Sequence, residues 1–486
     1  MRLPGPHGLF LLLFLAAPEA LPHSSNRNNG GPLQARLPAE SLDRGQEALA
    51  AETAFLQTHL FTDGRGMHLA PGLFTFYELL QRPEIPVDST GWILRILGFN
   101  LEDRRAIGLF GVDYRGARVG VLGCVGCHSG QAAGRTIVGL GNKRIDVGLV
   151  GQVAMAISRP CDWTRRLRAE HEQRLIERVM AFTSFLQDPA RTNVTQGMVP
   201  VSIVQHWFYA QAGKQMGPEM PRPGVKVPHL WGYGEKRKIG LFCDGFGDGS
   251  APGWAAMVEL AAGQTTEAVR TYRHRLDEVE ALFEKFLPPA YPFAIDRSRA
   301  RQGGEVFARA CCGCHGRYRK DALGFPIFEA PRHIPWEIVR TDTQRLRAMT
   351  TEFRRLVAAS PLSDLIQATT LPPGYFAPRL EGVWARFPYL HNASVPSIRA
   401  LLTRPPRRPT VWSLRDAGAL YRFDPIGVGL TVPNPGSREE LQRQAERGCR
   451  DVYSVRRLGH SNQGHWFGTD LSEEDKVALI EYLKTL

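Results

Sequence analysis

The sequence predicts a mainly α-helical protein of two domains with long loops and little β structure. Three observations support this prediction: amphipathic segments at helical spacing, a proline-rich break, and a Cys-x-x-Cys-His motif on each side of that break. At 486 residues the chain is too long for one ordinary core, because domains commonly contain roughly 100–200 residues. The two motifs comprise Cys124, Cys127 and His128, and Cys311, Cys314 and His315.

The first 40 residues predict an exported chain. Residues 1–20 have the pattern of a secretory signal peptide, with Arg2 before an apolar run from Leu9 to Ala17 that is too short to cross a bilayer. Residues 21–40 are rich in Asn, Gly, Pro and Ser, which is typical of a disordered segment. No later stretch has the composition of a membrane span, so we expect none in the mature protein.

The rest of the chain is predicted to form an N-terminal domain, residues 41–287, and a C-terminal domain, residues 288–486. Helical patterns begin near Ser41 and recur over 163–186 and 266–286. The last of these stops before Pro288 and Pro289, which cannot continue a helix and stiffen a linker. We therefore place the domain boundary at these prolines.

The two Cys-x-x-Cys-His motifs predict two covalently bound haem c groups, one in each domain. Two thiols form thioethers with the haem vinyl groups and the adjacent imidazole reaches the iron, so His128 and His315 are the predicted proximal ligands. A zinc site built from two Cys-x-x-Cys pairs is the alternative, but it explains neither the adjacent histidines nor the signal peptide. Because haem is attached to such motifs outside the bacterial cytoplasm, we predict a periplasmic protein.

The C-terminal domain has the features of a cytochrome c unit. Phe307 lies four residues before Cys311, where class I cytochromes c pack an aromatic residue against their last helix. Thr469 and Ser472 offer N-cap hydroxyls for that helix. Its predicted apolar face consists of Val477, Ile480, Leu483 and Leu486. Apart from the haem motifs, no internal repeat is expected.

The group that occupies the sixth coordination position of a haem iron determines whether the haem transfers electrons or carries out catalysis. For the second haem, the sequence limits the candidates for this ligand. The last methionine is Met349, which excludes a methionine from the C-terminal stretch. The histidines after the second motif are His333, His391, His460 and His465. His465 lies in a loop just before the terminal helix and is the predicted ligand, with His460 the next choice.

No sixth ligand stands out for the first haem, and catalytic residues are not assigned. The available side chains are Met155, Met180, Met198, His206, Met216, Met220 and His229. An iron that lacks a strong sixth ligand binds peroxide or dioxygen. Residues 207–209, or Trp231 with Phe242, are candidates for lining such a pocket, although aromatic residues more often pack in a core.

The remaining cysteines and the charge leave alternatives open. Cys161, Cys243, Cys312 and Cys449 allow three disulfide pairings, or they are free thiols. The net charge of +12 is partly offset by four haem propionates of about one negative charge each. A basic face would attract a small anionic electron-donor protein, but a generally solvated basic surface is the better explanation of the charge. No nucleic-acid-binding module is present in the sequence.

Several longer blocks accompany the haem motifs between about Gly108 and Leu486. They are Gly134 to Thr136, Gly139 to Gly141, Arg144 to Asp146, Lys226 to Trp231, Arg379 to Ala385, Pro388 to Asn392, Ser394 to Pro396, Ser461, Asn462, Gly464, His465 and Gly468 to Leu471. Together they resemble the bacterial dihaem cytochrome c peroxidase superfamily, in the branch with the rubber-cleaving dihaem oxygenases. The resemblance implies peroxide or oxygen chemistry at the first haem and electron entry at the second, whose sixth ligand is Met, His or Tyr. His465 matches the histidine of the last block.

One block departs from this superfamily. The peroxidases of this superfamily have a segment similar to Phe-Trp-Asp-Gly, whose Trp lies between the haems. The corresponding segment of this chain is Phe242-Cys243-Asp244-Gly245. Cys243 thus stands in place of the bridging indole, and Trp231 or Trp254 are candidates to replace it. Glu259 is the nearest acidic candidate for the distal position of the peroxidases.

These features predict a haem-dependent, peroxidase-like oxidoreductase. Its first haem is expected to react with peroxide or dioxygen while its second haem relays electrons. An electron-transfer cytochrome without turnover is one alternative. An oxygenase of an apolar or polyisoprenoid substrate is another, implied by the resemblance alone.

Overall fold

The computed structural model describes residues 67–69, 97–102, 105–114, 117–147, 149, 195–217, 219–232, 243–247, 266–271, 283, 286–320, 326–328, 333–366, 372–432 and 435–486. The chain separates into Met1–Glu47 and Ala48–Leu486, and every described residue belongs to the second unit. The predicted signal peptide, the disordered segment and the helices near Ser41 and over 163–186 lie outside the described residues. None of the described helices is long and apolar enough to cross a membrane.

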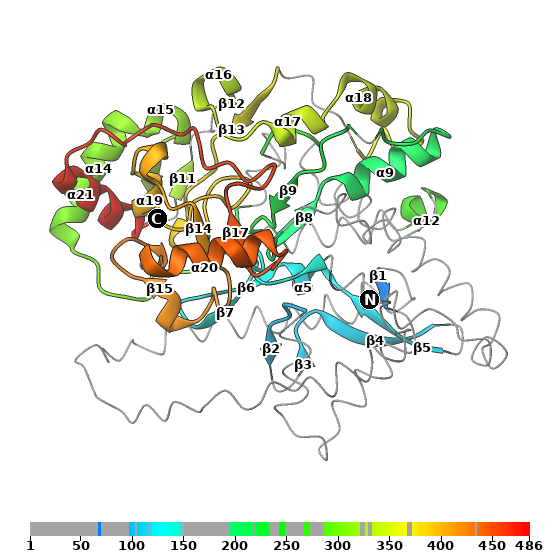
Figure 1. The fold of residues 1–486 in the computed structure, drawn as a ribbon, viewed down its shortest axis with the longest axis horizontal. Coiled ribbons are helices and arrows are strands. Elements are labelled where there is room, and N and C mark those ends of the chain that lie inside the picture. The colour runs from blue at the N-terminus through cyan, green and yellow to red at the C-terminus, as the bar shows by residue number, and fades with distance from the viewer. Residues whose placement is uncertain are drawn as a thin grey trace, which may run out of the picture. The chain divides into compact units, whose positions relative to one another are not determined.

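The first Cys-x-x-Cys-His motif lies between two antiparallel ladders (Figure 1). The elements are β1 (Met67–Leu69), β4 (Leu109–Tyr114), β5 (Ala117–Leu122), α5 (Cys124–Cys127), β6 (Ser129–Ala132) and β7 (Arg135–Val138). β5 pairs with β1 and β4, α5 follows, and β6 then pairs with β7. Ala133 and Gly134 join β6 to β7 with φ of 50° and 78°, and positive φ at both positions is typical of a type I′ hairpin turn.

The second motif is held by the first and last helices of the C-terminal half. α14 (Arg297–Ala310) leads directly into α15 (Cys312–His315) and packs beside α21 (Glu473–Leu483) (Figure 1). A Cβ atom on Gly303 would lie 1.9 Å from the Ala478 carbonyl oxygen, so glycine is what permits this close approach. The Phe307 and Tyr482 rings lie 5.2 Å apart, which confirms the predicted contact with the terminal helix.

The caps of these two helices follow from their sequence. Asp296 accepts hydrogen bonds from the amides of Ser298 and Arg299 at the start of α14. Ser472 accepts one from the Asp475 amide at 3.0 Å, which confirms Ser472 as the N-cap of α21. Thr469, the other candidate, instead donates its hydroxyl to the Trp466 carbonyl.

The other described strands are short, and α9 and α20 are the longest of the other described helices. The strands are β2 (Leu101–Glu102), β3 (Arg105–Ala106), β8 (Met198–Pro200), β9 (Gly224–Lys226), β10 (Tyr318–Lys320), β11 (Pro326–Phe328), β12 (His333–Pro335), β13 (Gly374–Phe376), β14 (Val411–Ser413), β15 (Phe423–Asp424), β16 (Gly429–Leu430) and β17 (Val452–Ser454). They form the two-stranded ladders β2–β3, β8–β9, β10–β11, β12–β13, β14–β17 and β15–β16. The helices are α9 (Ser202–Gln211), α12 (Thr266–Thr271), α16 (Trp336–Val339), α17 (Gln344–Ala348), α18 (Thr351–Ala358), α19 (Ile398–Leu401) and α20 (Pro435–Glu446), with 3₁₀ turns η2 (Val383–Ala385), η3 (Pro405–Arg407) and η4 (Leu420–Arg422).

The segment around Pro288 is packed against the C-terminal half. The helix predicted over 266–286 begins at Thr266 as α12, Phe283 is also helical, and most of what lies between is outside the described residues. Residues 286–296 contain no helix, and the Trp384 indole nitrogen donates to the Pro289 carbonyl at 2.8 Å. Buried residues from both sides, including Val125 and Trp384, belong to one hydrophobic cluster. The division into two haem domains at this point stays a prediction.

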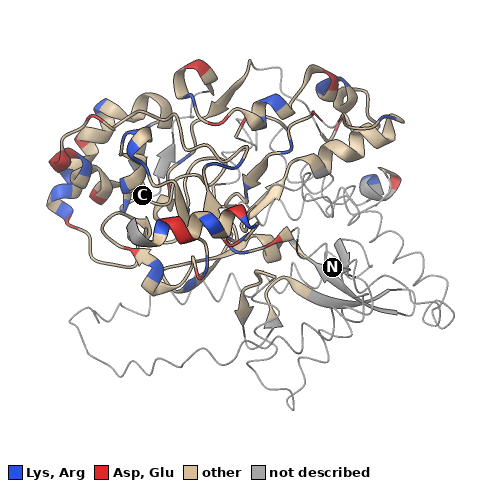
Figure 2. Cartoon of the chain, in the orientation of Figure 1, with Lys and Arg blue, Asp and Glu red and all other residues tan. Residues whose placement is uncertain are grey.

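The C-terminal helices carry mixed charge (Figure 2). On α20, Glu440 pairs with Arg443 at 2.9 Å and with Arg447 at 3.0 Å. Arg309 of α14 pairs with Asp475 of α21 at 2.9 Å. Exposed pairs of this kind contribute only about 0–1 kcal/mol each to stability, so their main effect is to balance charge locally.

Candidate haem sites

The first motif presents His128 in a fixed orientation. The side chain is 2 % exposed, and its Nδ1 lies 2.9 Å from the carbonyl oxygen of Pro228. A carbonyl only accepts, so Nδ1 carries the hydrogen and Nε2 is left to bind a metal. The backbone around the ring is also held, because the amides of Gly139 and Asn142 donate to the carbonyls of His128 and Cys127 at 2.7 and 2.8 Å.

The second motif repeats this arrangement. His315 Nδ1 lies 2.9 Å from the carbonyl oxygen of Pro378, so this ring also directs Nε2 away from its hydrogen-bonding partner. Burial lowers the pKa of His315, which favours the neutral ring that binds metal. Burial also raises the pKa values of the Cys127 and Cys311 thiols, to about 11 and about 12, so both sulfur atoms lie in surroundings that disfavour a charge. Uncharged thioether sulfur suits such surroundings.

Pro228 and Pro378, whose carbonyls accept these hydrogen bonds, are each the first residue of a short repeated sequence. The expectation of no repeat beyond the haem motifs was therefore wrong. The first proline repeat is Pro228-His229-Leu230-Trp231-Gly232, and the second proline repeat is Pro378-Arg379-Leu380-Glu381-Gly382. Their glycines share a positive φ, 67° and 61°. The pattern Pro-x-Leu-x-Gly after each Cys-x-x-Cys-His motif was the signal that could have revealed both proximal hydrogen-bond acceptors.

His465 lies beside the second motif at a separation that suits two ligands of one iron. A metal ion holds an imidazole nitrogen at about 2 Å, so two rings on opposite sides of one ion have centroids roughly 6 Å apart. The rings of His315 and His465 have centroids 6.3 Å apart and an interplanar angle of 52°. Burial, with the nearby His315 and Arg408, lowers the pKa of His465 to about 3, so its ring is neutral at physiological pH.

The loop that carries His465 is tightly held. His465 has φ of 48°, a conformation that few non-glycine residues adopt outside sites where the surroundings enforce it. Arg408 is 3 % exposed, and its guanidinium donates to five backbone carbonyls. Those carbonyls belong to Leu401, Thr403, Asn462, Gly464 and His465. All five N–H groups of Arg408 are therefore used, and three of them donate to the His465 loop.

The other C-terminal histidines take part in packing. His460, the second choice as ligand, is fully buried and stacks on Tyr453 at 4.6 Å. His391 stacks on Tyr375 at 4.6 Å, and His333 packs edge-on against Phe376 at 5.2 Å. Of the histidines that follow the second motif, His465 is the one that the structure places against the His315 ring.

Most of the candidate ligands of the first haem that the structure describes also have packing roles. Met198 is completely buried, and its sulfur accepts the Thr195 hydroxyl at 3.1 Å. Met216 and Met220 pack against the cluster that contains Phe208, Tyr209 and Phe353. The aromatic pair Phe208 and Tyr209, considered for a distal pocket, thus belongs to a core. Met155, Met180 and Phe242 lie outside the described residues.

Cys243 lies in a buried polar cluster. Its carbonyl accepts the Phe376 amide at 2.7 Å, and burial beside Asp244 raises the pKa of its thiol to about 12. Asp244 pairs with Arg345 at 3.1 Å, and both side chains are almost fully buried. Trp254 and Glu259 lie outside the described residues, whereas Trp231 is 2 % exposed and its indole nitrogen donates to the Glu381 carbonyl at 2.9 Å.

Six cysteine side chains that the structure describes form no disulfide: Cys127, Cys243, Cys311, Cys312, Cys314 and Cys449. Cys161 lies outside the described residues. Within the described residues, no group of three or more His, Cys, Asp or Glu side chains is arranged to hold a metal ion.

Comparison with known proteins agrees with a haem site in the C-terminal half. Residues 374–413 match the family of RoxA-like, cytochrome c-like domains. Two curated relatives come from Sinorhizobium fredii (strain NBRC 101917 / NGR234). Protein y4iM is 29 % identical over 254 residues, 43 % of this chain and 53 % of the relative, and y4iJ is 35 % identical over 270 residues, 42 % of each. The chain therefore spans about half the length of the curated relatives it matches.

The matched region contains functional parts of the second site. It includes the second proline repeat, whose first carbonyl accepts the His315 hydrogen bond, and Arg408, which holds the His465 loop. Residues 374–413 are thus similar to RoxA-like, cytochrome c-like domains, and cytochrome c domains carry covalently bound haem c.

Proposed function

We propose that this chain is a periplasmic dihaem c-type cytochrome that acts as an oxidoreductase. In this proposal peroxide or dioxygen reacts at the His128 haem, and electrons from a small redox protein enter at the His315 haem. The observation that carries it is the 6.3 Å separation of the His315 and His465 rings. An iron with two histidine ligands has no open position, so chemistry on a small oxidant is assigned to the other haem.

Bound haem would supply an iron centre that binds small oxidants and exchanges single electrons. The chain supplies the groups that hold and tune it. His128 and His315 each donate Nδ1–H to a proline carbonyl at 2.9 Å, which fixes the tautomer and makes Nε2 a stronger donor to iron. Arg408 holds the loop that presents His465.

Three hydrogen bonds and two short backbone segments form a continuous route between the two proximal histidines. Each histidine donates to the first residue of its proline repeat at 2.9 Å. Trp231 is the fourth residue of the first proline repeat, and it donates at 2.9 Å to Glu381, the fourth residue of the second. This route supports electron relay between the haems without an indole at Cys243.

Trp231→Phe tests this route. The substitution keeps a buried aromatic ring but removes the N–H donor to Glu381, so we expect slower electron exchange between the haems with unchanged haem attachment. The loss of one buried hydrogen bond should also lower the free energy of unfolding by about 1–3 kcal/mol. Flash reduction of one haem, followed by the absorbance of both, measures the exchange rate.

Trp336→Phe is the matched control, because the Trp336 indole donates to the Thr341 carbonyl at 2.7 Å and takes no part in this route. Equal exchange rates in the two variants would show that electrons do not follow the Trp231 route.

Stopped-flow mixing with hydrogen peroxide tests the function itself. In the half-reduced protein we expect peroxide to draw an electron from the haem at His315, with the absorbance change lost in His128→Ala. If neither haem reacts with peroxide or dioxygen, the protein is instead an electron carrier without turnover.

The resemblance to the rubber-cleaving dihaem oxygenases implies a second candidate, an oxygenase of an apolar substrate. Dioxygen consumption that depends on an added polyisoprenoid, in the absence of peroxide, would distinguish this activity from that of a peroxidase.

A further inference from the structure

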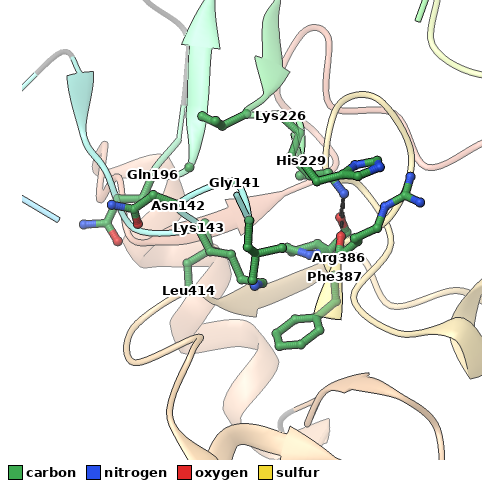
Figure 3. Close-up of a pocket in the computed structure, with 14 residues that line it drawn as sticks. Gly141, Asn142, Lys143, Gln196, Lys226, His229, Arg386, Phe387 and Leu414 are labelled. Atoms are coloured by element: carbon green, nitrogen blue, oxygen red, sulfur yellow. Dashed lines mark hydrogen bonds between the residues drawn. The ribbon is translucent and has the colours of Figure 1, made fainter. Parts of the chain in front are cut away.

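Three cations are among the residues that line a small pocket (Figure 3). Lys143, Lys226 and Arg386 line it together with His229, and its described lining contains no Asp or Glu. Asn142, also in the lining, is bound through its amide to the Cys127 carbonyl at 2.8 Å. His229 belongs to the first proline repeat, and Arg386 follows the second.

The three cations have carbonyl groups and aromatic rings as their hydrogen-bonding and cation–π partners. Lys143 is 6 % exposed, donates to the Gln131 carbonyl at 2.7 Å and lies 4.4 Å from the Phe387 ring centroid. Lys226 donates to the carbonyls of Pro388, at 2.8 Å, and Arg386. The Arg386 guanidinium donates in turn to the Arg379 carbonyl.

Among the residues that the structure describes, no carboxylate forms an ion pair with Lys143, Lys226 or Arg386. The nearby carboxylate of Glu381 is already paired with Arg379. Burial lowers the pKa of Lys143 to about 7, and burial together with repulsion from Arg386 and Lys143 lowers that of Lys226. Burial also lowers the pKa of Arg386 to about 10. Buried charges without an anionic partner cost several kcal/mol each, so this arrangement favours a bound anion.

We infer that Lys143, Lys226 and Arg386 form a carboxylate-binding site, and that its occupant is a propionate of the haem at His128. This inference rests on the proposed haem at that motif. Haem propionates are carboxylates that must lie near the attachment site, and the pocket adjoins the segment that holds Cys127 and His128. Ammonium and guanidinium groups form short, charge-assisted hydrogen bonds with carboxylates. A free carboxylate has the same chemistry and is the other possible source of the anion.

The test is a redox titration of the haem-loaded protein carrying Lys143→Met. Loss of a buried cation beside a propionate stabilises the oxidised iron, so the midpoint potential of one haem should fall by about 59 mV, a tenfold change in its oxidised-to-reduced ratio. Lys143→Arg retains the charge and should restore the potential. Lys214→Met removes an exposed lysine that pairs with Glu352 at 2.7 Å, and it should leave both potentials unchanged.

Titration with acetate separates the two sources of the carboxylate. If a propionate fills the site, acetate leaves the wild-type potentials unchanged and the Lys143→Met shift appears without it. If the wild-type potential moves only when acetate is added, the occupant is a free carboxylate and the propionate assignment is wrong. If Lys143→Met prevents haem attachment, Lys226→Met replaces it in the same titration. Potentials that match the Lys214→Met control throughout would overturn the site, whether or not the protein reacts with peroxide.

Discussion

Replacing His465 with alanine is expected to convert the haem at His315 from a low-spin to a high-spin centre. The rings of His315 and His465 have centroids 6.3 Å apart, so His465 is placed to complete the coordination of an iron bound by His315. Its loss should move the potential of this haem by on the order of 100 mV, because axial ligands set haem potentials over a range of about 0.8 V. Optical and resonance Raman spectra of the oxidised protein report the spin state directly.

Two further variants make this result specific. His465→Met should stay low-spin with a higher potential, because a methionine ligand raises the potential relative to histidine. Lys214→Met changes an exposed lysine that pairs with Glu352 and is no candidate ligand, so it should leave the spectrum unchanged. A low-spin spectrum in His465→Ala, with no added imidazole, would exclude His465 as the ligand.

Replacing Arg408 with leucine should have the largest effect on stability. Leucine fills part of the space but leaves five carbonyls without their donor, and the site is 3 % exposed. An unsatisfied buried acceptor costs about 1–3 kcal/mol, so we expect the free energy of unfolding to fall by about 3 kcal/mol or more. Chemical denaturation of the haem-loaded protein measures this change.

The same variant should weaken ligation by His465, because Arg408 donates to the carbonyls of both Gly464 and His465. A partial high-spin signal at the second haem is therefore expected in Arg408→Leu. Arg408→Lys should not rescue it, since an ammonium group has three donors and cannot replace the five hydrogen bonds by which the guanidinium ties the loop to Leu401 and Thr403. Arg407→Ala, an exposed neighbour in the sequence, is the control. If Arg408→Leu and Arg407→Ala were equally stable, the loop would not depend on this guanidinium.

The parts of the fold that local sequence determines were predictable. The hydroxyl of Ser472 followed by an acidic first turn marks the start of α21, and Phe307 lies at the spacing that brings it to Tyr482. The Cys-x-x-Cys-His motifs likewise place thiols and imidazole next to one another in the chain. Because no methionine follows Met349, the sequence predicted His465 as the sixth ligand of the second haem. The structure places His465 against the His315 ring.

The parts that depend on distant contacts were not predictable from local patterns. Strands of two or three residues, such as β14 and β17, are too short to show an alternating pattern. Arg408 and the carbonyls of the His465 loop are more than 50 residues apart, and nothing near Arg408 in the sequence indicates its role. The cation pocket brings Lys143 together with Lys226 and Arg386, which only the folded chain makes neighbours.

The proposed inequality of the two haems is tested most directly by electron paramagnetic resonance of the oxidised protein, before and after one equivalent of peroxide. We expect two signals: a low-spin signal from the haem held by His315 and His465, and a signal from the His128 haem that changes when peroxide is added. Loss of the low-spin signal in His465→Ala would assign it to the second haem. Two low-spin signals that peroxide leaves unchanged would contradict the proposed function.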